Sequence, residues 1–135
     1  MGDPRGMTCS SVCSVSLEPP TLLVCLRDGS PTLEAIMKSG TFALNLLHED
    51  AQQTAELFAS GNPRRFAMVA WEEGAGACGP HLVRDAHTVA DCEVVLTQQV
   101  GDHRIVFGGT RRITHRLSRA PLLYGMRQFR SWSRD

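Results

Sequence analysis

The sequence predicts a mostly antiparallel β-barrel that carries two short helices. Three observations predict it: an alternating segment opens the chain, two short helical patterns follow it, and two long strand patterns are joined by a turn near the end. The 135 residues, 42% of them hydrophobic, suffice for one core but not comfortably for two. We therefore expect a single domain over residues 1–135.

Two strands are expected at the start of the chain. Residues 7–17 alternate between two faces, one of which is rich in hydroxyl groups: Thr8, Ser10, Ser14 and Ser16. Plain solvent exposure would explain such a face, and so would hydrogen bonding to the polar rim of a flat heterocycle. After Pro19 and Pro20, residues 21–27 are almost all apolar, which predicts a strand buried on both faces.

Helices are expected on both sides of a third strand. Ser30 is a suitable helix cap with Pro31 at the first helical position, and Gly40 ends this helix. Residues 41–47 predict the strand. Residues 49–60 predict the second helix, and its buried side would contain Ala51, Ala55, Leu57 and Phe58.

The second half of the chain is expected to be mainly β-structure. A linker with little periodicity precedes two long strand patterns at residues 88–100 and 103–115, which Gly101-Asp102 joins as a hairpin. Short extended pieces are expected around residues 122–124 and 126–129. Hairpin connections of this kind favour an antiparallel barrel.

Composition argues against a membrane or secreted protein. The longest apolar run, residues 22–26, has the length of a strand, and the N-terminus has no apolar core of a signal peptide, so we expect a cytoplasmic chain. The five cysteines are irregularly spaced, which indicates reduced thiols. Cys9 and Cys13 lie too far apart along a strand to share one metal ion, and His81, His87 and His115 have no ligand spacing, so no metal site is expected.

Charge is distributed unevenly along a chain of zero net charge. Residues 1–103 contain six Lys/Arg and thirteen Asp/Glu, whereas residues 104–135 contain eight and one. The arginines alternate with strand-like residues and lack an aromatic ladder, so a solvated sheet face is favoured over a nucleic-acid surface. Contact of some of them with dinucleotide phosphates is a second interpretation.

One dinucleotide-binding motif is present by spacing alone. Gly74-Ala75-Gly76-Ala77-Cys78-Gly79 fits G-x-G-x-x-G, but Pro80-His81-Leu82 follows it where the motif requires a helix. We interpret this segment as a flexible loop.

A more specific phosphate site is expected at the first helix. Ser30 and Thr32 stand at the helix start, with Arg27 shortly before them. Helix N-terminal amides, hydroxyl groups and an arginine together can hold a phosphate, although a capping residue by itself is usually only a cap.

Several segments together resemble the flavin reductase family of FMN-binding split barrels. They occur in the family's order along nearly the whole chain: residues 6–20, 24–27, 30–36 and 39–47, Arg65-Phe66, Gly101-Asp102-His103 and residues 121–124. The resemblance implies an antiparallel split β-barrel of Greek-key type. It also implies an NAD(P)H-dependent flavin reductase that supplies reduced flavin to a partner monooxygenase and forms a homodimer.

The resemblance also implies where the ligands bind. FMN or FAD would contact eight residues: Thr8, Ser10, Ser11, Val12, Arg27, Ser30, Thr32 and Asn45. His103 and Tyr124 would border the nicotinamide of NADH or NADPH. No catalytic acid or base is needed, because hydride passes between two groups that already carry the reactivity.

The chain departs from the family in two places. Relatives begin with a helix and a further strand before the position of Gly6, so we expect an N-terminally short barrel. Relatives often have a His after Tyr124, where this chain has Gly125-Met126, a form similar to a subgroup found with oxygenases of natural-product biosynthesis.

Two other functions are compatible with the sequence. One is a non-catalytic flavin-binding protein of the same fold, and the other is a split barrel that handles haem or pyridoxine phosphate. The sequence does not distinguish FMN from FAD, or NADH from NADPH.

Overall fold

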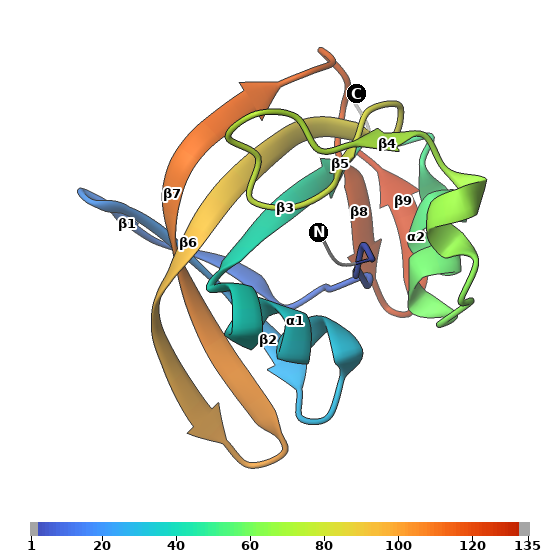
Figure 1. Cartoon of the computed structure of the whole chain (residues 1–135). Helices are drawn as coiled ribbons and strands as arrows, with labels where there is room; N and C mark the ends of the chain where they lie inside the picture. Colours follow the sequence, from blue (N-terminus) through green and yellow to red (C-terminus); the bar gives the residue numbers. More distant parts are fainter. Residues whose placement is uncertain (1–2, 133–135) are drawn as a thin grey trace.

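The computed structural model describes residues 3–132 as a curved antiparallel sheet with two helices and two small hairpin sheets (Figure 1). Its elements in chain order are β1 (Val12–Leu17), β2 (Pro20–Arg27), α1 (Pro31–Ser39), β3 (Thr41–Leu47), α2 (Gln52–Ala59), the 3-10 helix η1 (Arg65–Met68), β4 (Trp71–Glu72), β5 (His81–Leu82), β6 (Ala86–Val100), β7 (His103–His115), β8 (Leu122–Gly125) and β9 (Gln128–Ser131). No helix among these residues is long and apolar enough to span a bilayer.

The main sheet has the strand order β1-β2-β7-β6-β3, and every pair in it is antiparallel. The long strands β6 and β7 curve along one side of the molecule, and β1 projects from its edge (Figure 1). The chain crosses from β2 to β3 through α1, which places the two long strands between them. This arrangement confirms the expected mostly β fold with two short helices.

The first core lies between the sheet and α1. Leu33 and Ile36 of α1 pack with buried side chains of β2, β3, β6 and β7, including Val24 and Val106. Gly108 is required in this core, because a Cβ atom there would lie 2.6 Å from Cζ of Phe42. Burial also raises the pKa of the Cys92 thiol to about 11, so this cysteine stays neutral.

A second core forms around α2. Phe58 packs with Leu82, Ala86 and Val89, and Phe66 stacks edge-on against it at a ring-centre distance of 5.0 Å. The buried residues of α2 are Thr54, Ala55 and Phe58. Leu57, which we expected to be buried, is only half-buried.

The predicted strand over residues 7–17 is wrong in its first half. The strand that pairs with β2 is Val12–Leu17; residues 7–11 have no regular secondary structure, and of these Ser11 still accepts from the amide of Cys25 in β2 while Thr8 contacts α2. There the amide of Thr8 donates to the carbonyl of Phe58 at 3.3 Å, and its hydroxyl donates to the carbonyl of Ala55. The alternating pattern of residues 7–17 is compatible with packing on either β2 or α2, so the sequence could not show that the segment changes its partner.

Burial of β2 also differs from the expectation. Val24 and Leu26 are buried, but Leu23 and Cys25 on the opposite face are partly exposed. The strand is therefore buried on one face only.

Local signals for turns and helix ends were more accurate. Ser30 caps α1 by accepting from the amide of Leu33, and Gly40 ends it with φ of +74°. The hairpin of β6 and β7 turns at Gly101-Asp102, as expected. Met126, expected in an extended piece, instead lies in the β8–β9 turn with a φ of +52°.

The basic end of the chain pairs with acidic residues that precede it in sequence. Arg111 binds Glu93, Arg112 binds Asp91 at 3.3 Å, and Arg119 binds Asp50. The charge asymmetry along the sequence is thus partly neutralised across neighbouring strands and loops.

Candidate functional site

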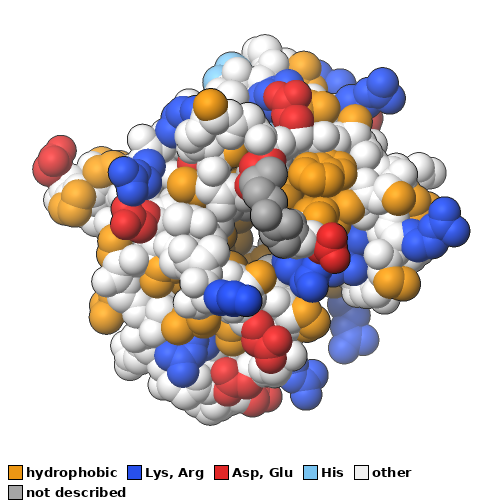
Figure 2. Space-filling view, in the orientation of Figure 1, with side chains coloured by type: hydrophobic (Ala, Val, Ile, Leu, Met, Phe, Trp, Pro, Cys, Tyr) orange, Lys and Arg blue, Asp and Glu red, His pale blue; other side chains and the backbone are white. Residues whose placement is uncertain are grey.

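A cavity of about 830 Å³ lies between the inner face of the sheet, the N-terminal segment and the two helices. Side chains or backbone from β2, β3, α1, α2, β8 and β9 line it, together with residues 3–10 and the loop before β5. A hollow opens near the middle of the face that Figure 2 shows. A volume of this size suits a ligand as large as a flavin ring system.

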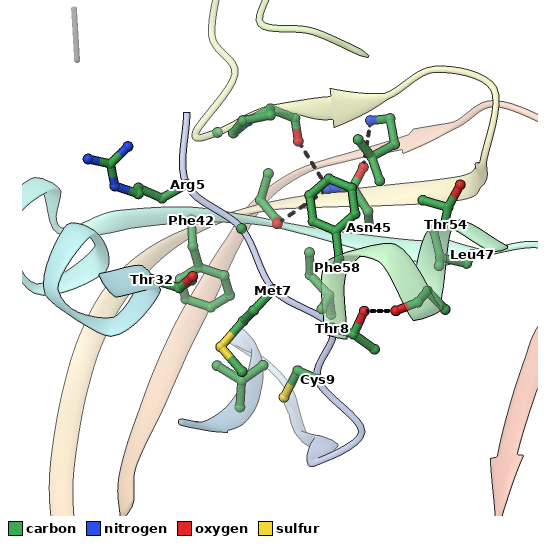
Figure 3. Close-up of a pocket in the computed structure, with 18 of the residues that line it drawn as sticks. Arg5, Met7, Thr8, Cys9, Thr32, Phe42, Asn45, Leu47, Thr54 and Phe58 are labelled. Carbon is green, nitrogen blue, oxygen red and sulfur yellow. Dashed lines mark hydrogen bonds between the residues drawn. The ribbon is translucent and has the colours of Figure 1, made fainter. Parts of the chain in front are cut away.

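The lining is mainly apolar and includes a few polar groups. Phe42 and Phe58 face the N-terminal segment, which carries Met7 and Thr8 past them (Figure 3). Polar side chains on the lining include Thr8, Ser10, Thr32 and Asn45, and charged ones come from Asp3, Arg5, Glu56 and Glu73. An apolar cavity with a small number of placed hydrogen-bonding groups is typical of a site for a flat aromatic ligand.

The N-terminal segment forms a wall of this cavity because several contacts hold it. Arg65 donates from Nε to the carbonyl of Gly6 at 2.9 Å, and its guanidinium carbon lies 5.9 Å from the ring centre of Phe58. Thr8 adds its two hydrogen bonds to α2. Arg65-Phe66, expected only to form a turn, therefore connects the wall to the second core.

The structure brings together six of the ten predicted site residues. The cavity is lined by Thr8, Ser10, Val12, Thr32, Asn45 and Tyr124. Ser11, Arg27, Ser30 and His103 lie outside this lining. Ser11 and Ser30 are close neighbours in sequence of lining residues, whereas Arg27 and His103 lie together at the end of the sheet.

The hydroxyl of Ser30 is engaged by the helix itself. Its Oγ accepts from the amide of Leu33 at 3.1 Å, which is the bond of an ordinary helix cap. Thr32, two residues later, has its place on the cavity lining in Figure 3. Of the two predicted hydroxyl groups, only that of Thr32 faces the cavity.

Asn45 lines the cavity but uses its amide to hold a loop. Its Nδ2 donates to the carbonyl of Pro80 at 3.0 Å, and its Oδ1 accepts from the amide of Leu82 at 2.9 Å (Figure 3). These bonds satisfy both ends of the side chain. Asn45 therefore shapes the cavity wall, a role that the sequence did not indicate.

Arg27 and His103 are neighbours at the end of the sheet. They are directly paired across β2 and β7, although we assigned them to different ligands. His103 binds the carboxylate of Asp102 at 2.8 Å, and this hydrogen bond and the histidine's charge lower the pKa of Asp102. The amide of Asp28 donates to the carbonyl of Asp102 at 2.9 Å, so the two turns at this end are connected.

The glycine-rich segment is a loop, as expected, but it is firmly held. The carboxylate of Asp91 accepts hydrogen bonds from the amide of Cys78 at 2.7 Å and from Nε2 of His81 at 2.9 Å. Nε of Arg112 donates to its second oxygen at 3.3 Å. Burial alone would raise the pKa of Asp91, but these hydrogen bonds and the charges of His81 and Arg112 outweigh it and lower the pKa.

Sequence analysis did not identify Asp91. It stands in a mainly apolar strand segment, and alternation places it on the same face as Val89, opposite Ala90 and Cys92. An acidic residue in such a position was the available signal, because a buried charge requires partners. In residues 3–132 no cluster of three or more potential metal ligands is present.

Comparison with known protein families gives one matching model. The flavin reductase like domain matches residues 1–133, which is nearly the whole chain.

Individual proteins of known name or structure are also similar. A flavin reductase (NADPH) from Lentzea aerocolonigenes is 46% identical over 132 residues, covering 98% of this chain and 76% of the relative. The reductase subunit HsaB of a flavin-dependent monooxygenase from Rhodococcus jostii is 33% identical, covering 95% of this chain and 65% of the relative. The solved structure of the NADH:FAD oxidoreductase SgcE6 from Streptomyces globisporus, in complex with NAD and FAD fragments, has a TM-score of 0.91 and 29% identity, covering 99% of this chain and 81% of that one.

Proposed function

The chain belongs to the flavin reductase like domain family, and from this premise we propose that its cavity binds the flavin whose reduction it catalyses. The protein is an NAD(P)H-dependent flavin reductase with the split-barrel fold. It uses NADH or NADPH and FMN or FAD, and it supplies reduced flavin to a partner monooxygenase.

The observation that carries the site is the composition of the cavity. Its size accommodates a flavin ring, its apolar walls include Phe42 and Phe58, and Ser10 and Thr32 supply hydroxyl groups at its margin, where Thr8, whose hydroxyl donates to Ala55, can act as an acceptor. The residues present therefore fit a flat heterocycle with a polar rim. Val12, at the start of β1, would contact the same ring.

The chemistry asks little of these side chains. Flavin and nicotinamide carry the hydride-transfer reactivity when they are bound. Thr8, Ser10 and Thr32 orient the flavin, and the apolar walls exclude water from the reacting face. No side chain is required as an acid or base.

The remaining predicted residues bind parts of the ligands that extend beyond the cavity. Arg27 and His103, adjacent at the sheet end, provide positive or hydrogen-bonding groups for phosphate and nicotinamide. Tyr124 lies on the lining, 52% exposed and 4.9 Å from the ring of Phe129, where its ring is available to stack on nicotinamide. Ser11 positions the backbone between Ser10 and Val12, and Ser30 caps α1, so neither residue acts through a hydroxyl group bound to the ligand.

We also infer a homodimer, because the outer face of the sheet is apolar. Leu23 and Leu96 both pair with Phe107, one from each side, so the three side chains form a row across neighbouring strands. Val106 and Gly108 on either side of Phe107 point into the core, which places this row on the opposite face. A second copy of the chain would cover it.

The test is the flavin dependence of nicotinamide oxidation. Purified, flavin-free protein should oxidise NADH or NADPH only after FMN or FAD is added, which the absorbance of the reduced nicotinamide reports. Equal rates with and without flavin would contradict the proposal, and so would flavin binding without any oxidation.

A further inference from the structure

One wall of the cavity is a loop without regular structure. Residues 73–80 connect β4 to β5, and Cys78, Gly79 and Pro80 of this loop line the cavity. A glycine-rich segment has a large conformational entropy, so it forms a defined wall only if side chains from elsewhere hold it.

The holding contacts converge on one buried carboxylate. We infer that Asp91 is a positioning residue that fixes residues 78–80 in place for flavin binding. The inference rests on the proposed function of the cavity. Asp91 lies on β6, its side chain is 1% exposed, and it does not line the cavity itself.

Three donors reach this carboxylate, and each restrains a different part of the loop region. The amide of Cys78 is bound at 2.7 Å, His81 of β5 at 2.9 Å, and Arg112 of β7 at 3.3 Å. Arg112 also donates from Nη1 to the carbonyl of Ala75 at 3.1 Å. Asp91 thus binds the loop directly and orients a second side chain that binds it.

The fit of the loop on β3 makes its position critical for the cavity. A Cβ atom at Gly79 would lie 3.0 Å from the backbone nitrogen of Ala43, so the loop already packs closely on the strand. Asn45 holds the following residues through Pro80 and Leu82. Between these anchors, the bond from Cys78 to Asp91 decides where residues 78–80 meet the cavity.

An amide in place of the carboxylate would keep the shape but remove the charge and one of the two acceptor oxygens. Cys78 and His81 donate to one oxygen of Asp91 and Arg112 donates to the other, so an Asn at position 91 cannot accept from all three: its NH₂ group replaces one acceptor, and the bonds that remain lose the negative charge that strengthens them. Asp91→Asn should therefore loosen the loop. Glu93→Gln is the matched control, because Glu93 lies on the same strand and its ion pair with Arg111 is exposed.

The experiment compares both variants with the unchanged protein, using the full chain. Hydrogen exchange is measured over residues 73–82, FMN and FAD affinities by fluorescence titration, and kcat and KM with NADH and NADPH at varied flavin. For Asp91→Asn we expect faster exchange in this segment, flavin affinity about tenfold weaker or more, and kcat at saturating flavin within about twofold. Glu93→Gln should change none of these values.

Unchanged exchange in residues 73–82, or unchanged flavin affinity, would overturn the inference. If Asp91→Asn does not fold, Arg112→Met is tested in its place. The side chain of Arg112 is 44% exposed, so its replacement should be tolerated, and its loss should loosen the same loop to a smaller extent. Absence of any loop-specific effect in that variant would also overturn the inference. An unchanged protein that binds no flavin would instead refute the proposed function, whatever the exchange shows.

Discussion

Ser30 and Thr32 stand two residues apart at the start of α1, but their hydroxyl groups are in different surroundings. The Ser30 hydroxyl binds the amide of Leu33, whereas Thr32 lines the cavity. Residue type and spacing predicted that both hydroxyl groups would contact the ligand. Only the direction of each side chain separates a helix cap from a ligand contact.

This difference leads to a paired prediction. Thr32→Val should weaken flavin binding by roughly 1 to 3 kcal/mol and leave the melting temperature nearly unchanged, because it removes one hydrogen bond to the ligand. Ser30→Ala should cost about 1 kcal/mol of folding stability through the lost cap, with a smaller effect on affinity. Fluorescence titration and thermal melting measure the two quantities. Unchanged affinity in Thr32→Val would remove this residue from the site.

Asp91 gives a prediction about pH. Its pKa is lowered in the folded protein, so its stabilising contribution is complete above the pKa of the unfolded chain, about 4, and is lost as the pH falls through the folded value. Asp91→Asn should therefore reduce the free energy of unfolding by about 1.5 to 3 kcal/mol at pH 7. The difference should shrink below about pH 4 as the carboxylate of the parent protein is protonated.

Denaturant unfolding of both proteins between neutral and acidic pH measures this difference. Glu93→Gln provides the comparison, since its exposed ion pair should contribute little at any pH. A stability difference between parent and Asp91→Asn that does not change with pH would show that packing, rather than charge, is responsible.

At the scale of secondary-structure elements, local signals predicted ends and turns better than partners. The cap at Ser30, the end at Gly40 and the turn at Gly101-Asp102 depend on a few adjacent residues, and all three are present. The first half of the first strand was predicted wrongly because Thr8 hydrogen-bonds to α2 instead of to a neighbouring strand, which a period of two residues does not reveal. For the same reason, the N-terminal wall of the cavity could not be predicted.

The β8–β9 hairpin contains an unusual turn. Met126 and Arg127 have φ values of +52° and +59°, and they lie between the paired residues Gly125 and Gln128. A two-residue turn with both φ values positive favours Asn-Gly, because other side chains are strained there by about 1 kcal/mol or more each.

Replacing Met126-Arg127 with Asn-Gly should therefore stabilise this hairpin by about 1 to 2 kcal/mol. Slower hydrogen exchange in β8 and β9, with a melting temperature that is equal or higher, is the expected result. Met126→Lys is the control, since it changes a 94% exposed side chain without relieving the backbone. Equal exchange rates in all three proteins would show that the turn is not strained.

At the scale of the whole molecule, the fold class followed from the sequence because it depends on the number and kind of elements. The position of the cavity did not follow, because it depends on curvature of the sheet and on the path of residues 3–10. The acidic partners of the arginines after residue 103 could not be predicted either, because Arg111, Arg112 and Arg119 pair with Glu93, Asp91 and Asp50, which precede them by 18 or more residues in the sequence.

The apolar row of Leu23, Phe107 and Leu96 allows a test of the homodimer. Leu96 is 57% exposed in the single chain, on the sheet face opposite the core. Leu96→Asp would place a charge from each copy into a shared apolar interface, and an uncompensated buried charge costs about 3 to 5 kcal/mol. We therefore expect the dimer dissociation constant to rise by about 100-fold or more, while the fold is retained.

Sedimentation velocity across a range of protein concentrations measures this constant, and Met126→Lys, at the β8–β9 turn, should leave it unchanged. A parent protein that is monomeric at every concentration, or a Leu96→Asp variant that associates as the parent does, would remove this face of the sheet from the proposed interface.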